Sequence, residues 1–335
     1  MLFYSTIRRR WYSFYYSTYF KSQRTILSFG TILLICLFII LKKKNNCWND
    51  YYRSRLFCFV LTSQSNLENR SRAVYETWVH RCGRFVFITR LNSSTSYTIY
   101  DNQYKYLKED QLPIQYIPTL PDENYSHLSD KVRSTLLFLN KYYPNYDWYL
   151  KVNDDTYIIV ENLLRFLVST IKRRPKPVLY GYRFREDYYV NGGGGYVLTR
   201  KGLNLFGSYI NNDSRYFECK SPMEDIMVGS CCKRIFEIAP KDETKDLITV
   251  GETIDDEGRE RFHPQPFRVH FNGLPNKIAR YWIYDKAFHH NLFGYESISE
   301  TAISFHYTQP EDMYQMDSLL YHIRQFDKEV CPSHS

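Results

Sequence analysis

Three oxygen-bearing side chains follow one apolar stretch of this sequence without interruption: Asn153, Asp154 and Asp155. The stretch before them, 147–152, is mostly aromatic and aliphatic, which is typical of a buried strand. Polar side chains at the carboxyl end of a strand lie where an open α/β sheet binds its ligand. Amide and carboxylate oxygens are hard donors that suit Mn²⁺ or Mg²⁺ holding a diphosphate. The plain alternative is an acidic turn that caps the following helix.

Three further segments could complete such a site. Four consecutive glycines, 192–195, allow a tight turn and a close approach of the backbone to something bulky. Glu224 and Asp225 precede an apolar helical pattern, either as first-turn acids favoured by the helix dipole or as a source of a general base. His306 is a lone histidine in a late strand pattern. It can be a third metal ligand only if Asp155 lies close to it in the fold.

The elements that must position these residues alternate between strands and helices. The patterns predict strands at 56–61, 85–88, 114–117, 147–152, 178–181, 196–199 and 302–307, and helices at 71–79, 97–108, 128–143 and 313–326. The charged segment 242–261 is predicted to be a loop. This alternation predicts an α/β fold with a mostly parallel sheet and flanking helices. No GxGxxG follows the first strand and no Walker A motif occurs, which disfavours a dinucleotide-binding or P-loop enzyme.

An uncharged run near the N-terminus, 25–41, lies between two basic clusters and is about as short as a membrane helix can be. A buried core helix or a cleaved signal peptide are the alternatives, but the basic flanks and the lack of a cleavage site favour an uncleaved signal anchor. We predict a cytoplasmic tail (1–24), a membrane span (25–41), a stem (42–54) and a luminal domain (55–335). The tail holds more basic residues, which favours a type II topology, although the lysine triplet after the span opposes it. The net charge of +8 is partly local to these flanks, so no nucleic-acid partner is expected.

Of the eight cysteines, one lies in the predicted span and seven follow it. No CxxC pair or His/Cys cluster has zinc-site spacing, so disulfides in an oxidising lumen are expected. We predict that Cys58 pairs with Cys82, and Cys219 with Cys231 or Cys232. Because seven is odd, at least one thiol stays free or pairs between chains.

Several ordered segments resemble the β-1,3-glycosyltransferase family (glycosyltransferase family 31), and within it the core 1 β-1,3-galactosyltransferases. The matching segments are 76–82, 147–162, 193–199, 224–231, 261–264, 304–307, 313–314 and 321–322. The resemblance implies a GT-A fold and a single-pass type II protein of the Golgi membrane with a luminal catalytic domain. It also implies Mn²⁺-dependent, inverting transfer of galactose from UDP-galactose. The acceptor would be O3 of N-acetylgalactosamine on Ser or Thr of glycoproteins, and the product the core 1 disaccharide.

The resemblance also assigns roles to residues. The outer acids of the family's metal motif fall on Asn153 and Asp155, His306 is implied as a metal ligand, and Asp225 as the catalytic base. Donor contacts are expected at Asp154, Thr62, Lys131, Arg133, Gly194 and Tyr307, and acceptor contacts at Glu224 and Trp282. The basic pair at 131 and 133 could instead decorate a solvated helix face, and Trp282 could be plain core.

The sequence departs from the family at two places. Asn153 stands where the family has an acid, so metal affinity is expected to fall. The segment 295–300 stands where the family has an adjacent cysteine pair, so the family's disulfide pattern cannot be copied. Two alternatives follow: a non-catalytic, chaperone-like paralogue, or a transferase of the same fold with another donor or acceptor. A homodimer or a chaperone partner is left open.

Overall fold

The computed structural model describes residues 50–90, 99–100, 112–115, 117–173, 176–185, 189–238, 247–272, 283, 285–289 and 294–323. The chain divides into two compact units, Met1–Tyr51 and Tyr52–Ser335, and all elements named below belong to the second. No helix within the described ranges has the length and apolar character to cross a membrane. The predicted tail, the predicted span and most of the predicted stem lie outside those ranges.

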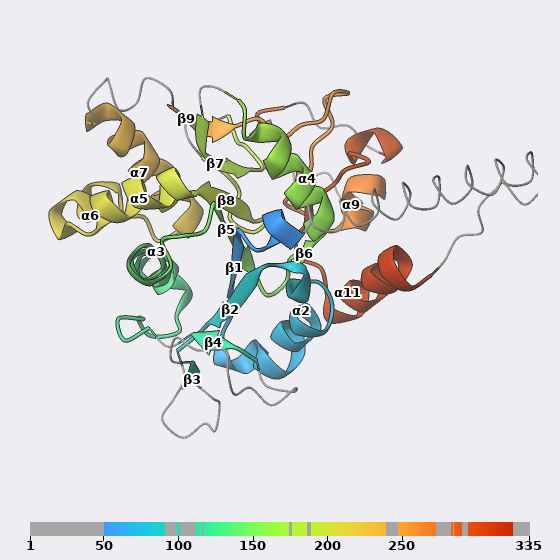
Figure 1. Cartoon of the computed structure of the whole chain (residues 1–335), viewed down its shortest axis with the longest axis horizontal. Helices are drawn as coiled ribbons and strands as arrows, with labels where there is room; N and C mark the ends of the chain where they lie inside the picture. The colour runs from blue at the N-terminus through green and yellow to red at the C-terminus, as the bar shows by residue number, and fades with distance from the viewer. Residues whose placement is uncertain are drawn as a thin grey trace, which may run out of the picture. The chain divides into compact units, whose positions relative to one another are not determined.

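The centre of the second unit is a twisted sheet of eight strands in the order β3-β4-β2-β1-β5-β8-β7-β9 (Figure 1). The strands are β1 (Leu56–Leu61), β2 (Arg84–Ile88), β3 (Ile99–Tyr100), β4 (Ile114–Gln115), β5 (Trp148–Asn153), β7 (Lys176–Gly181), β8 (Tyr196–Thr199) and β9 (Leu247–Gly251). Pairing is parallel except where β8 runs against β5 and β7. The predicted α/β architecture with a mostly parallel sheet is therefore confirmed.

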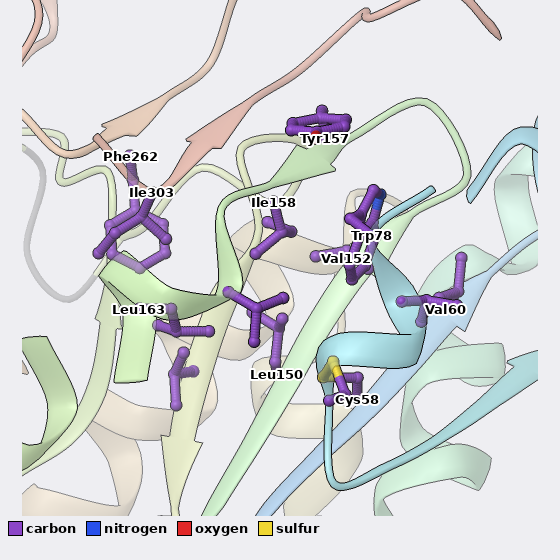
Figure 2. Close-up of a cluster of buried hydrophobic side chains, with 14 of the residues drawn as sticks. Cys58, Val60, Trp78, Leu150, Val152, Tyr157, Ile158, Leu163, Phe262 and Ile303 are labelled. Carbon is purple, nitrogen blue, oxygen red and sulfur yellow. A yellow bond between two sulfur atoms is a disulfide. The ribbon is translucent and has the colours of Figure 1, made fainter. Parts of the chain in front are cut away.

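Helices cover both faces of this sheet, which explains why β1 is buried along its whole length. Alternate side chains of β1 point to opposite faces. Phe57, Phe59 and Leu61 pack with α3 (Leu128–Tyr142), α5 (Arg200–Ile210), α6 (Asp213–Cys219) and α7 (Glu224–Ile238). Cys58 and Val60 pack with Trp78 and with α2 (Arg72–Glu76), α4 (Val160–Thr170) and α11 (Pro310–Asp317), as part of the cluster drawn in Figure 2.

A second, three-stranded sheet positions the end of the chain against the acidic turn. Its order is β10 (Phe262–His263), β11 (Ser304–Phe305) and β6 (Tyr157–Ile158). β11 runs antiparallel to β6, with Phe305 opposite Tyr157. Because β6 follows Asp155 directly, this pairing brings residue 306 beside the carboxyl end of β5.

The structure corrects four predicted elements. Within the segment 97–108, predicted as a helix, residues 99–100 form strand β3, and the rest of the segment lies outside the described ranges. The segment 242–261 is not all loop, because its apolar run 247–251 forms β9 and pairs in parallel with β7 at the sheet edge. The predicted helix 71–79 is broken into a π-helical turn η2 (Leu67–Ser71), α2 and a 3₁₀ turn η3 (Val79–Arg81). The closing helix begins at Pro310, whose fixed φ suits a first helical turn, and continues from Ser318 to His322 as the π-helical turn η7.

Both predicted disulfides are present. Cys58 on β1 is bonded to Cys82, which follows η3, and Cys219 at the end of α6 is bonded to Cys231 in α7. The choice left open between residues 231 and 232 is thus settled for Cys231. Cys232 is a free, buried thiol, and burial raises its pKa to about 12. It is therefore protonated and unreactive at neutral pH.

Candidate active site

The carboxyl end of β5 carries two buried carboxylates with different partners. Asp154 accepts hydrogen bonds from the hydroxyl of Thr62 (2.6 Å) and the amide of Asn66 (2.9 Å). Burial is the main reason that its pKa is raised, although these donors act in the other direction. Asp154 is thus fixed by the segment that follows β1.

Asp155 faces His306, as the sequence prediction required. Nε2 of His306 lies 3.3 Å from Oδ1 of Asp155, and the backbone N–H of Thr308 donates to the Asp155 carbonyl (2.9 Å). Burial opposes ionisation of Asp155, but the nearby His306 and Arg70 outweigh it, so its pKa is lowered. Asp155 therefore carries a negative charge at neutral pH, although the residue is only 8% exposed to solvent.

Two buried atoms of this pair are poorly satisfied within the described ranges. Oδ1 of Asp155 has only the imidazole of His306 at 3.3 Å, which does not meet hydrogen-bond geometry, and Nδ1 of His306 makes no hydrogen bond. A buried oxygen acceptor left in this way is costly unless another group, such as a cation, contacts it. Asn153, the third predicted ligand, is half-buried. Its side chain makes no hydrogen bond seen within the described ranges. Among the described residues, no three His, Cys, Asp or Glu side chains gather as a complete metal site, so a cation would need the Asn153 amide or oxygens of the donor as further ligands.

The glycine loop packs directly on His306. A Cβ placed on Gly193 would lie 2.0 Å from Cε1 of His306, so only glycine fits against the imidazole. Side chains from the two neighbouring elements hold the loop by its carbonyls: Thr156 donates to Gly193 (2.8 Å) and Ser304 to Gly194 (2.6 Å). Gly195 has φ +80°, a left-handed conformation that favours glycine. The loop therefore makes a tight turn and packs closely against His306, as the sequence predicted.

The same loop also binds Asp225. The N–H of Gly192 (3.1 Å) and the hydroxyl of Tyr189 (3.2 Å) donate to Oδ2 of Asp225, and the N–H of Ile226 donates to Oδ1 (2.9 Å). A carboxylate has about four acceptor positions, so these three bonds leave room for one more donor. Asp225 is half-buried at the start of α7 and can accept a proton from a ligand hydroxyl.

Glu224 lies beside Asp225 but points into the protein. It is 4% exposed, forms an ion pair with Lys151, and accepts a hydrogen bond from the hydroxyl of Tyr196 (3.2 Å). Lys151 also donates to the carbonyl of Gly192 (3.1 Å). Burial raises the pKa of Glu224 even though Lys151 acts against the shift. The placement does not fit the predicted acceptor contact and gives Glu224 a supporting role under the glycine loop.

Four predicted contacts remain to be placed. Lys131 is buried and reaches the site indirectly, since it donates to the Thr62 carbonyl (2.5 Å) and pairs with Glu123 (3.0 Å). Arg133 lies away from the site, where it donates to the carbonyl of Ile210 (2.7 Å) and pairs with Asp213.

Tyr307 is half-exposed and stacks on His306 with ring centroids 3.8 Å apart, at the unusual φ of 52°. A non-glycine residue in this conformation is strained and is held there by its surroundings. Trp282 lies outside the described residues.

Arg70 is a site residue that the sequence analysis missed. Its Nη1 lies 4.0 Å from Oδ1 of Asp154 and 3.9 Å from Oδ2 of Asp155. Asn66 and Tyr189 were missed as well. All three lie in polar stretches without a recognisable pattern, and only the fold places them at the carboxylates.

A large cavity lies next to β11. Its volume is about 640 Å³, and it is lined mainly by apolar side chains of α9 (Phe267–Asn272), α11, η7 and β11, among them Phe267, Phe305 and Leu320. Asp155, Asp225 and His306 do not line it.

Residues 107–192 match the family model described as Galactosyltransferase. Over this stretch the chain is similar to galactosyltransferases. The matched stretch contains the acidic turn and ends at the first glycine of the loop, so Asp225 and His306 lie beyond it.

The chain is also 29% identical over 276 residues to glycoprotein-N-acetylgalactosamine 3-beta-galactosyltransferase 1 of Xenopus laevis, an overlap of 81% of this chain and 67% of that protein. Among solved structures, galactosyltransferase LgtC in complex with donor and acceptor sugar analogs is 10% identical, with a TM-score of 0.37 over 81% of this chain and 98% of that chain. A glycosyltransferase involved in glycosylation of the PBCV-1 major capsid is 12% identical, with a TM-score of 0.33 over 59% and 81% of the respective chains.

Proposed function

We propose that this galactosyltransferase domain transfers galactose from UDP-galactose to O3 of N-acetylgalactosamine on Ser or Thr of glycoproteins, with inversion at the anomeric carbon. The observation that carries the proposal is the position of three side chains around one glycine loop. His306, paired with Asp155, packs against Gly193 of the loop, and Asp225 accepts a hydrogen bond from the neighbouring Gly192. The name of the Xenopus relative supports the choice of donor and acceptor.

In the proposed reaction Asp225 is the general base. It would take the proton from O3 of the acceptor as that oxygen attacks the anomeric carbon of galactose. The new bond forms between O3 and the anomeric carbon while the bond to the diphosphate oxygen breaks and UDP leaves. Because one displacement occurs, the configuration inverts and no carboxylate forms a covalent intermediate.

A divalent cation, Mn²⁺ in our proposal, fits the donor set described above. Oδ1 of Asp155 is a buried acceptor without a hydrogen bond, and His306 offers an imidazole nitrogen beside it. Asn153 would add a neutral amide oxygen. When bound, such an ion stabilises the negative charge that develops on the departing diphosphate.

The test is transfer by the purified full-length chain with UDP-galactose, Mn²⁺ and an N-acetylgalactosaminyl peptide. We expect release of UDP and a β-1,3-linked product. Asp225→Asn should lower turnover by about 10²- to 10⁴-fold, the range for loss of a general base, while UDP still binds. The control is Asp213→Asn, which changes another first-turn acid that is far more exposed. Equal turnover of the Asp225 variant and wild type would overturn the assignment of the base.

The same assay separates the alternatives. A screen of UDP-sugars against several acceptor glycans would reveal a transferase with another substrate. If wild type is inactive across a wide range of Mn²⁺ while Asn153→Asp is active, the natural chain has lost its metal-dependent activity. Dependence of an active enzyme on this chain would then favour a chaperone-like paralogue.

We further propose that residues 25–41 anchor the protein in the Golgi membrane with the catalytic domain in the lumen. The support is the uncharged run between basic clusters and the two disulfides, which suit an oxidising compartment. Protease treatment of sealed microsomes tests this topology. We expect a fragment containing 55–335 to survive until detergent is added.

A further inference from the structure

Arg70 lies at the two carboxylates with most of its hydrogen-bonding capacity unused. It is in η2, directly after the loop that follows β1, and its side chain is 37% exposed. Its partners within the described ranges are Asp154 and Asp155, at N–O distances of 4.0 and 3.9 Å, close to the upper limit for an ion pair. A guanidinium has five N–H donors, so Arg70 can still donate to an anion that enters the site.

The other cations near the glycine loop and the carboxylates are already engaged. Lys131 donates to the Thr62 carbonyl and pairs with Glu123, and Lys151 is buried against Glu224. Asp154 keeps two hydrogen bonds without Arg70, because Thr62 and Asn66 both donate to its Oδ2, while its Oδ1 lies 4.0 Å from Arg70, beyond hydrogen-bond distance. Arg70 is therefore not explained by the folding of this segment alone.

Asn153 and Arg70 both make the site less negative, because one is a neutral amide in place of an acid and the other is a cation. The acidic turn ends in two carboxylates and one neutral amide, and a guanidinium lies within 4.0 Å of both carboxylates. A less negative site binds a divalent cation less tightly, because each missing charge weakens the attraction. A cation with free donors in the same place favours an anion such as a diphosphate.

We propose that Arg70 supplies part of the positive charge that holds the diphosphate of the donor, so that nucleotide binding by this chain depends only partly on a divalent cation. This inference rests on the proposed function, since it takes a nucleoside diphosphate sugar as the donor. It predicts opposite effects of one substitution on two ligands. Removing the Arg70 charge weakens binding of the diphosphate and strengthens binding of the metal.

The experiment measures binding rather than turnover, with the full-length chain. Calorimetry in EDTA gives the dissociation constants of UDP and of uridine, and paramagnetic resonance gives that of Mn²⁺. For Arg70→Gln we expect UDP to bind about 10- to 100-fold more weakly, the loss of hydrogen bonds to a charged group, with uridine unchanged. Mn²⁺ should bind more tightly to this variant and to Asn153→Asp. Arg70→Lys should give an intermediate loss of UDP affinity, because it keeps the charge without the planar fork.

Arg72→Gln is the matched control. Arg72 is two residues along, pairs with Glu68 at 3.7 Å and is 23% exposed, so its loss should leave all three dissociation constants unchanged. A variant of Arg70 that weakens UDP and Mn²⁺ alike would indicate a purely structural role and overturn the inference. UDP binding that disappears in EDTA for wild type would overturn it too, and would leave the proposed function intact. Failure of UDP to bind with or without Mn²⁺ would reject the proposed donor and this inference together.

Discussion

Replacement of Lys151 by Met should destabilise this protein strongly, because it leaves Glu224 buried without its cation. The side chains of Lys151 and Glu224 are 0% and 4% exposed, so water cannot solvate the remaining carboxylate. Removing one partner of a buried pair costs about 3–5 kcal/mol. The hydroxyl of Tyr196 remains as a hydrogen-bond donor to Glu224, which places the expected loss in the free energy of unfolding toward the lower end of this range.

Urea denaturation of three variants tests this reasoning. The double variant Lys151→Met/Glu224→Gln should recover to within about 2 kcal/mol of wild type, since no charge is then buried. The control Lys220→Met breaks a pair with Asp130 whose members are 35% and 29% exposed, and should cost less than about 1 kcal/mol. The defect of the Lys151 variant should also shrink at acid pH, where Glu224 is neutral in both states. A loss below about 1 kcal/mol, or a double variant as unstable as the single one, would refute the argument.

Three further predictions concern the loop, the pH dependence and a disulfide. Gly193→Ala should lower turnover by about 100-fold, because its Cβ would displace His306; near-normal turnover in a folded variant would contradict the contact. Burial raises the pKa of Glu260 to about 7 from its ordinary 4.5, so its contribution to stability is complete below pH 4.5 and is lost as the pH rises through 7. Thermal unfolding should therefore show a loss of up to about 3 kcal/mol over this window that Glu260→Gln removes, and an unchanged slope in that variant would argue against the shift. Replacing Cys58 and Cys82 by Ser opens a loop of 24 residues and should cost about 3 kcal/mol in urea denaturation; wild type after reduction should be at least as unstable, because reduction also opens Cys219–Cys231.

Much of the central fold could be predicted because the apolar runs are long and the polar or proline residues that end them are easy to recognise. The strand at 56–61 has the observed bounds of β1, and the helix predicted at 128–143 ends within one residue of α3. β9 was missed because its short apolar run is surrounded by charges, and pairing with β7 decides its conformation. The helix predicted at 71–79 is less regular than expected, because Thr77 has non-helical backbone angles (φ −106°, ψ −91°) and ends α2 at Glu76.

The residues of the candidate site could likewise be predicted only in part. Residue types marked Asp155, Asp225 and His306 as candidates, although each also had a plain structural explanation and their roles came from the family resemblance. They could not distinguish Glu224 from its neighbour. Adjacent residues at the start of a helix point in different directions, and only the packing shows that Glu224 faces Lys151 while Asp225 faces the loop.

The sequence by itself determined the parallel sheet, the disulfide cysteines and the chemical types at the site, since these depend on local pattern and composition. The tertiary structure decided which of these groups meet. His306 reaches Asp155 only through the pairing of β11 with β6, and Arg70 reaches the same carboxylate because β1 and β5 are neighbours in the sheet. Such contacts join residues far apart in the chain, so their geometry is fixed by strand register and not by any signal that a short stretch of sequence carries.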